Sequence, residues 1–153
     1  MLEAGMKAPS FKLPTSNGND LAVPTGGPMV LYFYPKDDTP GCTTEAIEFS
    51  ARKNEFANLG VTIVGVSPDP IKKHDKFIAK HSLTIPLVAD EEKTALEAYG
   101  VWVEKQMYGK TYMGVERATF LISADGDIVQ VWRKVRVKGH VDAVLDAAQQ
   151  HFG

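Results

Sequence analysis

The sequence is poor in cysteine, because its 153 residues include only one, Cys42. One cysteine cannot form a disulfide within the chain, which excludes the small secreted folds that disulfides hold together. Long apolar runs are also missing: the run Met29 to Tyr34 falls far short of the roughly 20 residues that cross a bilayer. Residues 1–7 include an acidic side chain and no apolar stretch. We therefore expect no secretory signal, no membrane partner and a cytoplasmic location.

A strong excess of charge of either sign is absent as well. The formal net charge is -2, which provides no field to attract nucleic acid or an anionic membrane surface. A basic run near the C-terminus alternates with valines, and this alternation favours a solvated strand face over a nucleic-acid site: Arg133, Lys134, Arg136 and Lys138. The histidines lack the spacing of metal ligands, so we expect surface or helix-end positions and no metal site: His74, His81, His140 and His151.

What the sequence does contain is the ordinary mixture of a globular protein, with 44% hydrophobic and 24% charged residues. This length and mixture predict a single domain over residues 1–153. Turn-forming residues before position 28 predict two short strands or loops. Apolar patterns predict strands at 29–34, 61–66, 87–88, 117–122 and 128–132, and helices at 42–59, 71–80, 92–99 and around 141–148.

The alternation of strands and helices predicts parallel β-α-β units. The turn residues 124–127 predict a hairpin that adds antiparallel strands. The expected fold class is therefore α/β, with a central mixed β-sheet flanked by helices. Three aromatic residues have no assigned place in this scheme and could rim a pocket, meet a partner or pack in the core: Trp102, Tyr108 and Tyr112.

Cys42 lies in a segment whose chemistry favours an ionised thiol. Thr39 is a suitable N-cap residue, and Pro40 fits the first helical position because its missing N–H would be unpaired there. This places Cys42 in the first turn of a helix. Free backbone N–H groups and the positive end of the helix dipole favour a thiolate at that position.

The helix dipole alone is too weak to ionise a thiol at neutral pH. A free thiol with a pKa of about 8.5 is about 3% ionised at pH 7, and lowering the pKa to about 6 requires about 3.4 kcal/mol. The dipole supplies about 0.3–1 kcal/mol, up to about 2 in a favourable geometry. Glu45 acts in the opposite direction. A reactive Cys42 therefore requires a basic partner from elsewhere in the chain.

The residues Pro35, Thr39 and Cys42 stand at the spacing Pro-x-x-x-Thr-x-x-Cys, which resembles the signature of the peroxiredoxin family. The surrounding residues 32–45 are similar to the Q-type branch, the bacterioferritin comigratory proteins. The similarity extends to residues 107–110, 114–120 and 132–140, and it covers essentially the whole chain. The resemblance implies a thioredoxin-like fold with an N-terminal extension.

The resemblance also implies roles for individual residues. Arg117 matches the arginine that provides the missing cation, Thr39 would hydrogen-bond the peroxide, and Pro35 would shield the pocket. The backbone N–H groups of Gly41 and Cys42 would complete the oxyanion site. The implied activity is that of a thiol-dependent peroxidase in antioxidant defence, which reduces hydrogen peroxide and organic hydroperoxides through a sulfenic acid at Cys42. No metal, flavin or nucleotide cofactor is expected.

The sequence departs from the Q-type pattern at the positions of a second, resolving cysteine. These positions hold Ile47 and Ile78, so the chain resembles a one-cysteine variant. An external thiol must then resolve the sulfenic acid. Thioredoxin, a glutaredoxin, glutathione or a second-subunit cysteine could supply that thiol, and the Q-type resemblance favours a monomer. Two other functions stay open at this point: a peroxide sensor that oxidises once, and an interaction module with an inert thiol.

Overall fold

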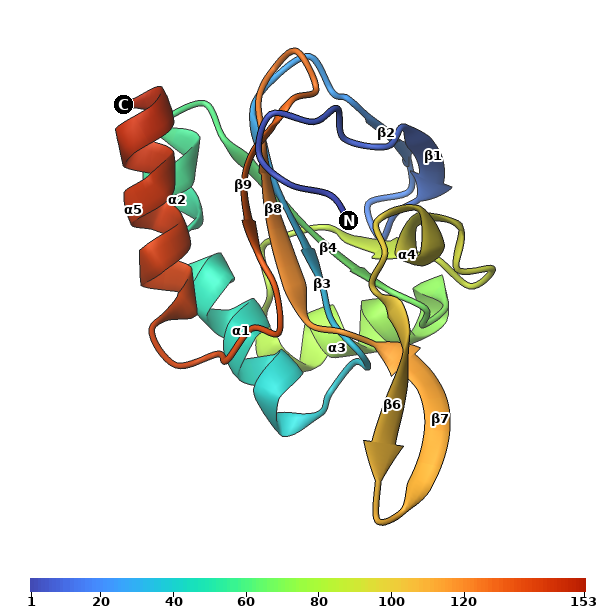
Figure 1. The fold of residues 1–153 in the computed structure, drawn as a ribbon. Coiled ribbons are helices and arrows are strands. Elements are labelled where there is room, and N and C mark those ends of the chain that lie inside the picture. The colour runs from blue at the N-terminus through green and yellow to red at the C-terminus, as the bar shows by residue number, and fades with distance from the viewer.

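The computed structural model describes residues 1–153, and a five-stranded mixed sheet lies at its centre (Figure 1). The strand order is β5-β4-β3-β8-β9. The middle strand β3 is parallel to β4 and antiparallel to β8, while β4 is parallel to β5 and β8 antiparallel to β9. This arrangement confirms the predicted mixed sheet. The strands are β3 (Met29–Phe33), β4 (Thr62–Ser67), β5 (Leu87–Ala89), β8 (Ala118–Ile122) and β9 (Ile128–Trp132).

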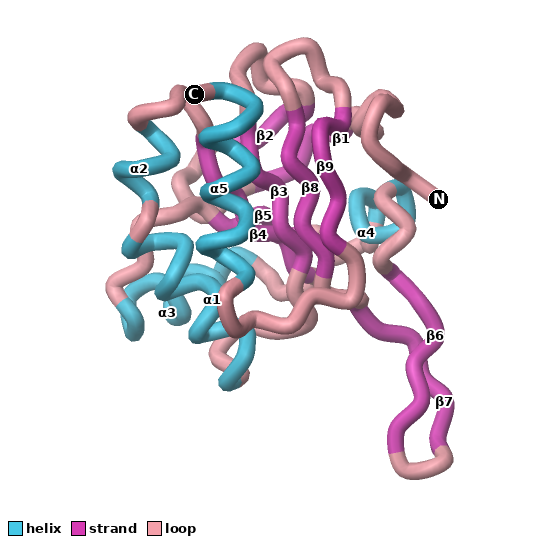
Figure 2. Tube along the Cα trace, turned by 60° about the vertical axis from the view of Figure 1, so that its left-hand side comes forward, coloured by secondary structure: helices cyan, strands magenta, loops and turns pink.

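Helices cover both faces of this sheet (Figures 1 and 2). They are α1 (Pro40–Ala51), α2 (Lys53–Ala57), α3 (Ile71–His81), α4 (Thr94–Ala98) and α5 (His140–Phe152). Successive side chains of β3 point to opposite faces. Tyr32 belongs to an apolar cluster with residues of α1, α2, α3 and α5, whereas Leu31 belongs to a second cluster with residues of α4. The predicted helix over 42–59 is divided at Arg52 into α1 and α2.

The N-terminal segment forms a small sheet of its own. Strands β1 (Phe11–Pro14) and β2 (Asp20–Val23) pair antiparallel, which confirms the strand interpretation of this region. An isolated bridge joins Thr15 to Val88 of the edge strand β5. This small sheet packs against the face of the central sheet that also carries α4 (Figure 1).

A second small sheet was not predicted from the sequence. Strands β6 (Trp102–Met107) and β7 (Lys110–Val115) form an antiparallel hairpin that projects from the body of the molecule in both views (Figures 1 and 2). Its exposed apolar side chains include Met107, Tyr108 and Tyr112. The two tyrosines thus lie outside the core, whereas Trp102 is partly buried against the second cluster.

Two sequence-based expectations are wrong. His74 is buried rather than on the surface, because both of its ring nitrogens have hydrogen-bond partners inside the protein. His140 begins α5, which agrees with the expected helix-end position, although its ring is buried. The basic run 133–138 lies in the connection between β9 and α5 and not on a strand, because β9 ends at Trp132. No helix has the length and apolar content that would allow it to span a bilayer.

Candidate active site

Cys42 lies in the first turn of α1, as the sequence predicts. Thr39 occupies the N-cap position and Pro40 the first helical position. The hydrogen bond from the Thr43 N–H to the Thr39 carbonyl (2.8 Å) is the first of the helix, so the N–H groups of Gly41 and Cys42 lie ahead of the intrahelical ladder. The thiol is free and only 2% exposed. Cys42 therefore lies at the positive end of the helix dipole, where two backbone N–H groups have no partner within the helix.

Arg117 places a guanidinium beside the Cys42 sulfur. Its Nη2 donates to the Cys42 Sγ at 3.3 Å, although 75 residues separate the two positions in the sequence. Arg117 directly precedes β8, which pairs with β3, and β3 leads into the segment that carries Cys42. Gly41 permits this approach, because a Cβ atom at Gly41 would lie 3.2 Å from the Arg117 Nη2.

Glu45 is a third member of the site that the sequence reasoning treated only as an opposing charge. Its Oε1 accepts from the Arg117 Nη1 at 2.7 Å, its side chain is fully buried, and its Oε2 has no hydrogen-bond partner. Burial raises the pKa of Glu45 to about 7, although Arg117 acts in the opposite direction. The spacing of three residues from Cys42 on one helix could have indicated this shared face.

The positive charge of Arg117 is favoured by its two acidic neighbours, Glu45 and Cys42. Burial lowers the pKa of Arg117, but Glu45 and Cys42 outweigh burial and leave that pKa above its ordinary value. A guanidinium that stays positive can hold a thiolate and can also stabilise negative charge on an oxygen that approaches the same sulfur. One side chain therefore joins the Cys42 thiol to a buried carboxyl group.

Thr39 and Pro35 lie on the loop that leads into α1. The Thr39 hydroxyl donates to the Lys36 carbonyl at 2.8 Å and does not cap the helix, contrary to the N-cap role expected for the side chain. Because its hydrogen is engaged, the hydroxyl oxygen is available as an acceptor. Pro35 is partly buried at the start of the loop.

A buried polar network holds this loop through Asp37. The Asp37 carboxylate accepts from the Tyr34 hydroxyl (2.5 Å) and from the His74 Nδ1 (2.6 Å). The His74 Nε2 lies 2.9 Å from the Val88 carbonyl. The Asp69 carboxylate accepts from the Asp37 N–H at 2.8 Å, so both the side chain and the backbone of Asp37 are held.

Two further groups lie within the electrostatic reach of Arg117. The His140 ring pairs with the Thr119 hydroxyl at 2.7 Å. Burial and, secondarily, Arg117 lower the pKa of His140 to about 4, so the ring is neutral at pH 7. Burial and then Arg117 also lower the pKa of Lys105 on β6. The hairpin thus brings a second cation toward the site.

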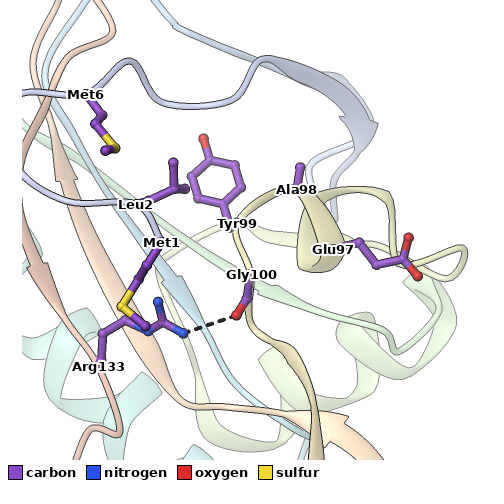
Figure 3. A pocket seen from close by; sticks show the side chains of 8 residues that line it. All are labelled: Met1, Leu2, Met6, Glu97, Ala98, Tyr99, Gly100 and Arg133. Carbon is purple, nitrogen blue, oxygen red and sulfur yellow. Dashed lines mark hydrogen bonds between the residues drawn. The ribbon is translucent and has the colours of Figure 1, made fainter.

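A hollow of about 380 Å³ lies elsewhere on the molecule, between the N-terminal residues and α4 (Figure 3). Met1, Leu2 and Tyr99 line it, and Arg133 donates to the Gly100 carbonyl at 3.1 Å on its rim. None of the predicted site residues lines this hollow. The chemistry of Cys42 therefore belongs to a recessed position at the start of α1 and not to this hollow.

Comparison with known proteins agrees with this geometry. The profile of the AhpC/TSA family matches residues 4–131. Peroxiredoxin Bcp of Xanthomonas campestris is 48% identical over 150 residues, which covers 95% of this chain and 94% of the relative. Peroxiredoxin Bcp of Bacillus subtilis is 48% identical over 146 residues, with 94% and 93% covered.

Solved structures show the same fold. Xanthomonas campestris peroxiredoxin Q superimposes with a TM-score of 0.89 at 48% identity, covering 94% of this chain and 92% of the other. A cysteine-to-serine mutant of Xylella fastidiosa PrxQ superimposes with a TM-score of 0.93 at 38% identity, with 99% and 98% covered. The predicted thioredoxin-like fold is thereby confirmed. Two of the Xanthomonas structures are cysteine-to-serine mutants at different positions, whereas this chain has one cysteine. The chain therefore belongs to the AhpC/TSA family, in its peroxiredoxin Q/Bcp branch, and is a thiol-dependent peroxidase.

Proposed function

We propose that Cys42 is the nucleophile of this peroxidase and that Arg117 activates it. The observation that carries the proposal is the 3.3 Å contact between the Arg117 Nη2 and the Cys42 Sγ at the N-terminus of α1. The Cys42 thiolate attacks the terminal oxygen of a hydroperoxide in line with the O–O bond. The S–O bond forms as the O–O bond breaks, and the alkoxide or hydroxide that leaves takes up a proton. Cys42 becomes a sulfenic acid.

The neighbouring groups orient the hydroperoxide and stabilise the charge that moves. The Thr39 oxygen accepts from the peroxide O–H, because the Thr39 hydrogen is already engaged with the Lys36 carbonyl. Arg117 and the N–H groups of Gly41 and Cys42 meet the developing negative charge. Pro35 shields the thiolate from water. The single predicted domain over residues 1–153 supplies all of these groups.

An external thiol regenerates Cys42. The two positions at which the Q-type resemblance places a second cysteine are occupied by Ile47, which is 43% exposed, and Ile78, which packs against the core. The external thiol condenses with the sulfenic acid to a mixed disulfide and water, and a second thiol then releases reduced Cys42. Thioredoxin, a glutaredoxin or glutathione could serve. Action as a monomer in the cytoplasm remains part of the proposal.

The substrates we propose are hydrogen peroxide and organic hydroperoxides. A solved structure of the Xanthomonas campestris bacterioferritin comigratory protein is described in connection with its alkyl peroxide reduction activity. That relative is 47% identical to this chain and superimposes with a TM-score of 0.89. Its activity supports the organic hydroperoxides as a substrate class.

Turnover with excess thiol tests the proposal. Hydrogen peroxide and tert-butyl hydroperoxide should each be consumed for many equivalents of protein, and intact mass should show one added oxygen at Cys42 before thiol is added. Cys42→Ser should consume neither while it keeps the far-ultraviolet circular dichroism of the parent. Consumption that stops after one equivalent would indicate a sensor, and the absence of a sulfenic acid adduct would indicate an inert thiol.

A further inference from the structure

The connection between β9 and α5 carries an excess of positive charge beside Cys42. We define the basic loop as residues 133–139. We propose that it docks the external reductant and that this reductant is an anionic thiol, with carboxylates near its sulfur. The inference rests on the proposed function, because it concerns the step that regenerates Cys42.

Two contacts seat the basic loop on the active site. The Val135 N–H donates to the Arg117 carbonyl at 3.0 Å. The Val137 Cγ2 lies 3.9 Å from the position of a Cβ at Gly41, the residue next to Cys42. The connection passes beside the beginning of α1 in both views (Figures 1 and 2). The loop therefore lies against two residues that surround the sulfur, Arg117 and Gly41.

The side chains of the basic loop alternate between protein and solvent. Val135 and Val137 are partly buried, whereas Lys134, Arg136 and Lys138 are exposed. The valines thus anchor the loop, and the cations between them face outward. This is the alternation that the sequence showed, but on a loop rather than on a sheet.

These cations have no anionic partner within the protein. Lys134, Arg136 and Lys138 form none of the ion pairs of the structure. The nearby carboxylates are already engaged, because Glu116 pairs with Arg133 at 2.6 Å and Glu45 with Arg117 at 2.7 Å. The chain as a whole carries a charge of -2, so the positive charge is a local feature of this surface.

The chemistry of regeneration identifies the kind of molecule that this surface fits. A hydroperoxide group is small and neutral and gains little from an extended cationic surface. The reductant must instead hold its sulfur in line with the Cys42 sulfur, while its remaining groups lie on the surrounding surface. Arginine and lysine side chains bind carboxylates, and cations near the entrance also raise the local concentration of an anionic molecule.

The step balances without another reactant. The Cys42 sulfenic acid and one thiol give a mixed disulfide and water, so Cys42 gives up its oxygen and the S–S bond forms. A second molecule of the thiol attacks the outer sulfur, which releases the symmetrical disulfide and reduced Cys42. The basic loop would act in both of these reactions and not in the attack on peroxide.

The test compares thiols of different charge with the purified full-length protein. Peroxide turnover is measured with 2-mercaptoethanol, 3-mercaptopropionate and mercaptosuccinate at equal thiolate concentration. We expect kcat/KM for the thiol to rise with its negative charge, by about tenfold from the neutral to the doubly charged thiol. Salt should remove this preference, because screening at about 1 M acts over about 3 Å.

Two double variants locate the effect. Arg136→Gln with Lys138→Gln should lose most of the preference for mercaptosuccinate and keep the single-turnover rate of oxidation by peroxide. Lys12→Gln with Lys53→Gln removes the same charge from exposed positions that also form no ion pair, and it should keep the preference. The single-turnover rate shows that each variant retains a folded active site.

The outcomes separate this inference from the proposed function. Equal use of neutral and anionic thiols, or equal loss in both double variants, would overturn the docking role of the basic loop while sustained turnover upheld the peroxidase. Oxidation that no thiol can reverse would overturn both. A preference for the anionic thiols that only the basic-loop variant loses would support the inference.

Discussion

Arg117 contacts a thiol and a carboxyl group with the two ends of one guanidinium. Only one of these neighbours needs to carry a negative charge for the guanidinium to be compensated. Burial holds Glu45 partly protonated near pH 7, and this leaves the positive charge of Arg117 available to the sulfur. At the scale of single residues, reactivity therefore depends on how the two acidic groups share one cation.

Replacement of Arg117 tests this sharing. Arg117→Ala removes a charge-assisted hydrogen bond of about 1.5–3 kcal/mol, which corresponds to a rate of oxidation by peroxide about 10- to 100-fold slower. Arg117→Lys keeps the charge and should recover part of the loss. Wild-type speed in Arg117→Ala would show that another group activates the sulfur.

Glu45 should make stability depend on pH. Its pKa is raised from the ordinary value of 4.5 to about 7 in the folded protein, so the native state binds a proton that the unfolded chain releases. This contribution to stability is complete below about 4.5 and is lost as the pH rises through about 7. In Glu45→Gln, urea unfolding at pH 5 and pH 8 should therefore show a smaller decrease in the free energy of unfolding. An unchanged decrease would assign the pH dependence to other groups.

At the scale of elements, the position of Thr39 depends on the network under its loop. Three residues meet there: Tyr34 directly after β3, Asp69 in the segment after β4, and His74 on α3. All three bond to the Asp37 side chain or to its backbone. A loop held at both its side chains and its backbone retains one conformation when substrate arrives. Through this network, the position of α3 helps to fix the position of the loop that carries Thr39.

Replacing His74 and His81 in turn tests whether the buried network stabilises the loop, because both histidines lie on α3 and both pair with an aspartate of the loop. His74→Ala removes one of the two side-chain donors to the buried Asp37 carboxylate and should cost about 1–3 kcal/mol of unfolding free energy. His81→Ala breaks a pair with the exposed Asp38 and should lower the free energy of unfolding clearly less. Urea unfolding measures both. Similar losses in the two variants would contradict a special role for the buried network.

At the scale of the whole molecule, the projecting hairpin is the least integrated part. Its outer residues are exposed on both strands, and its exposed apolar side chains are Met107, Tyr108, Tyr112 and Met113. Exposed apolar groups of this kind can support association between proteins. If the chain is a monomer, as we expect, these exposed side chains contribute too little to association to join two copies.

Sedimentation equilibrium at micromolar concentration should give the mass of one chain, 16.7 kDa. Tyr108→Ser with Met113→Ser should leave that mass unchanged. The same variant should also keep the free energy of unfolding within about 1 kcal/mol, because exposed side chains contribute little to it. A concentration-dependent dimer that this double variant abolishes would show that the hairpin joins two copies.

Local sequence patterns are enough to predict the central strands, the helix start at Cys42 and the need for a distant cation. Apolar runs must be buried, and the Thr-Pro pair acts on the residues directly beside it, so these features are local. The partnership with Arg117 could be predicted only through the family resemblance, because the two residues are 75 positions apart. Family resemblance likewise supplied the roles of Thr39 and Pro35.

The remaining features depend on contacts between distant parts of the chain. The sequence does not indicate the hairpin β6–β7, because its polar, exposed residues bury no continuous face. The sequence favours a surface or helix-end position for His74, because its partner Asp37 is 37 residues away. It favours a strand for the basic run, because alternation with valine suits a strand as well as an anchored loop. Burial of Glu45 likewise depends on the fold that packs around it. Local patterns record which side chains avoid water, but partners that are distant in the sequence meet only after the chain has folded.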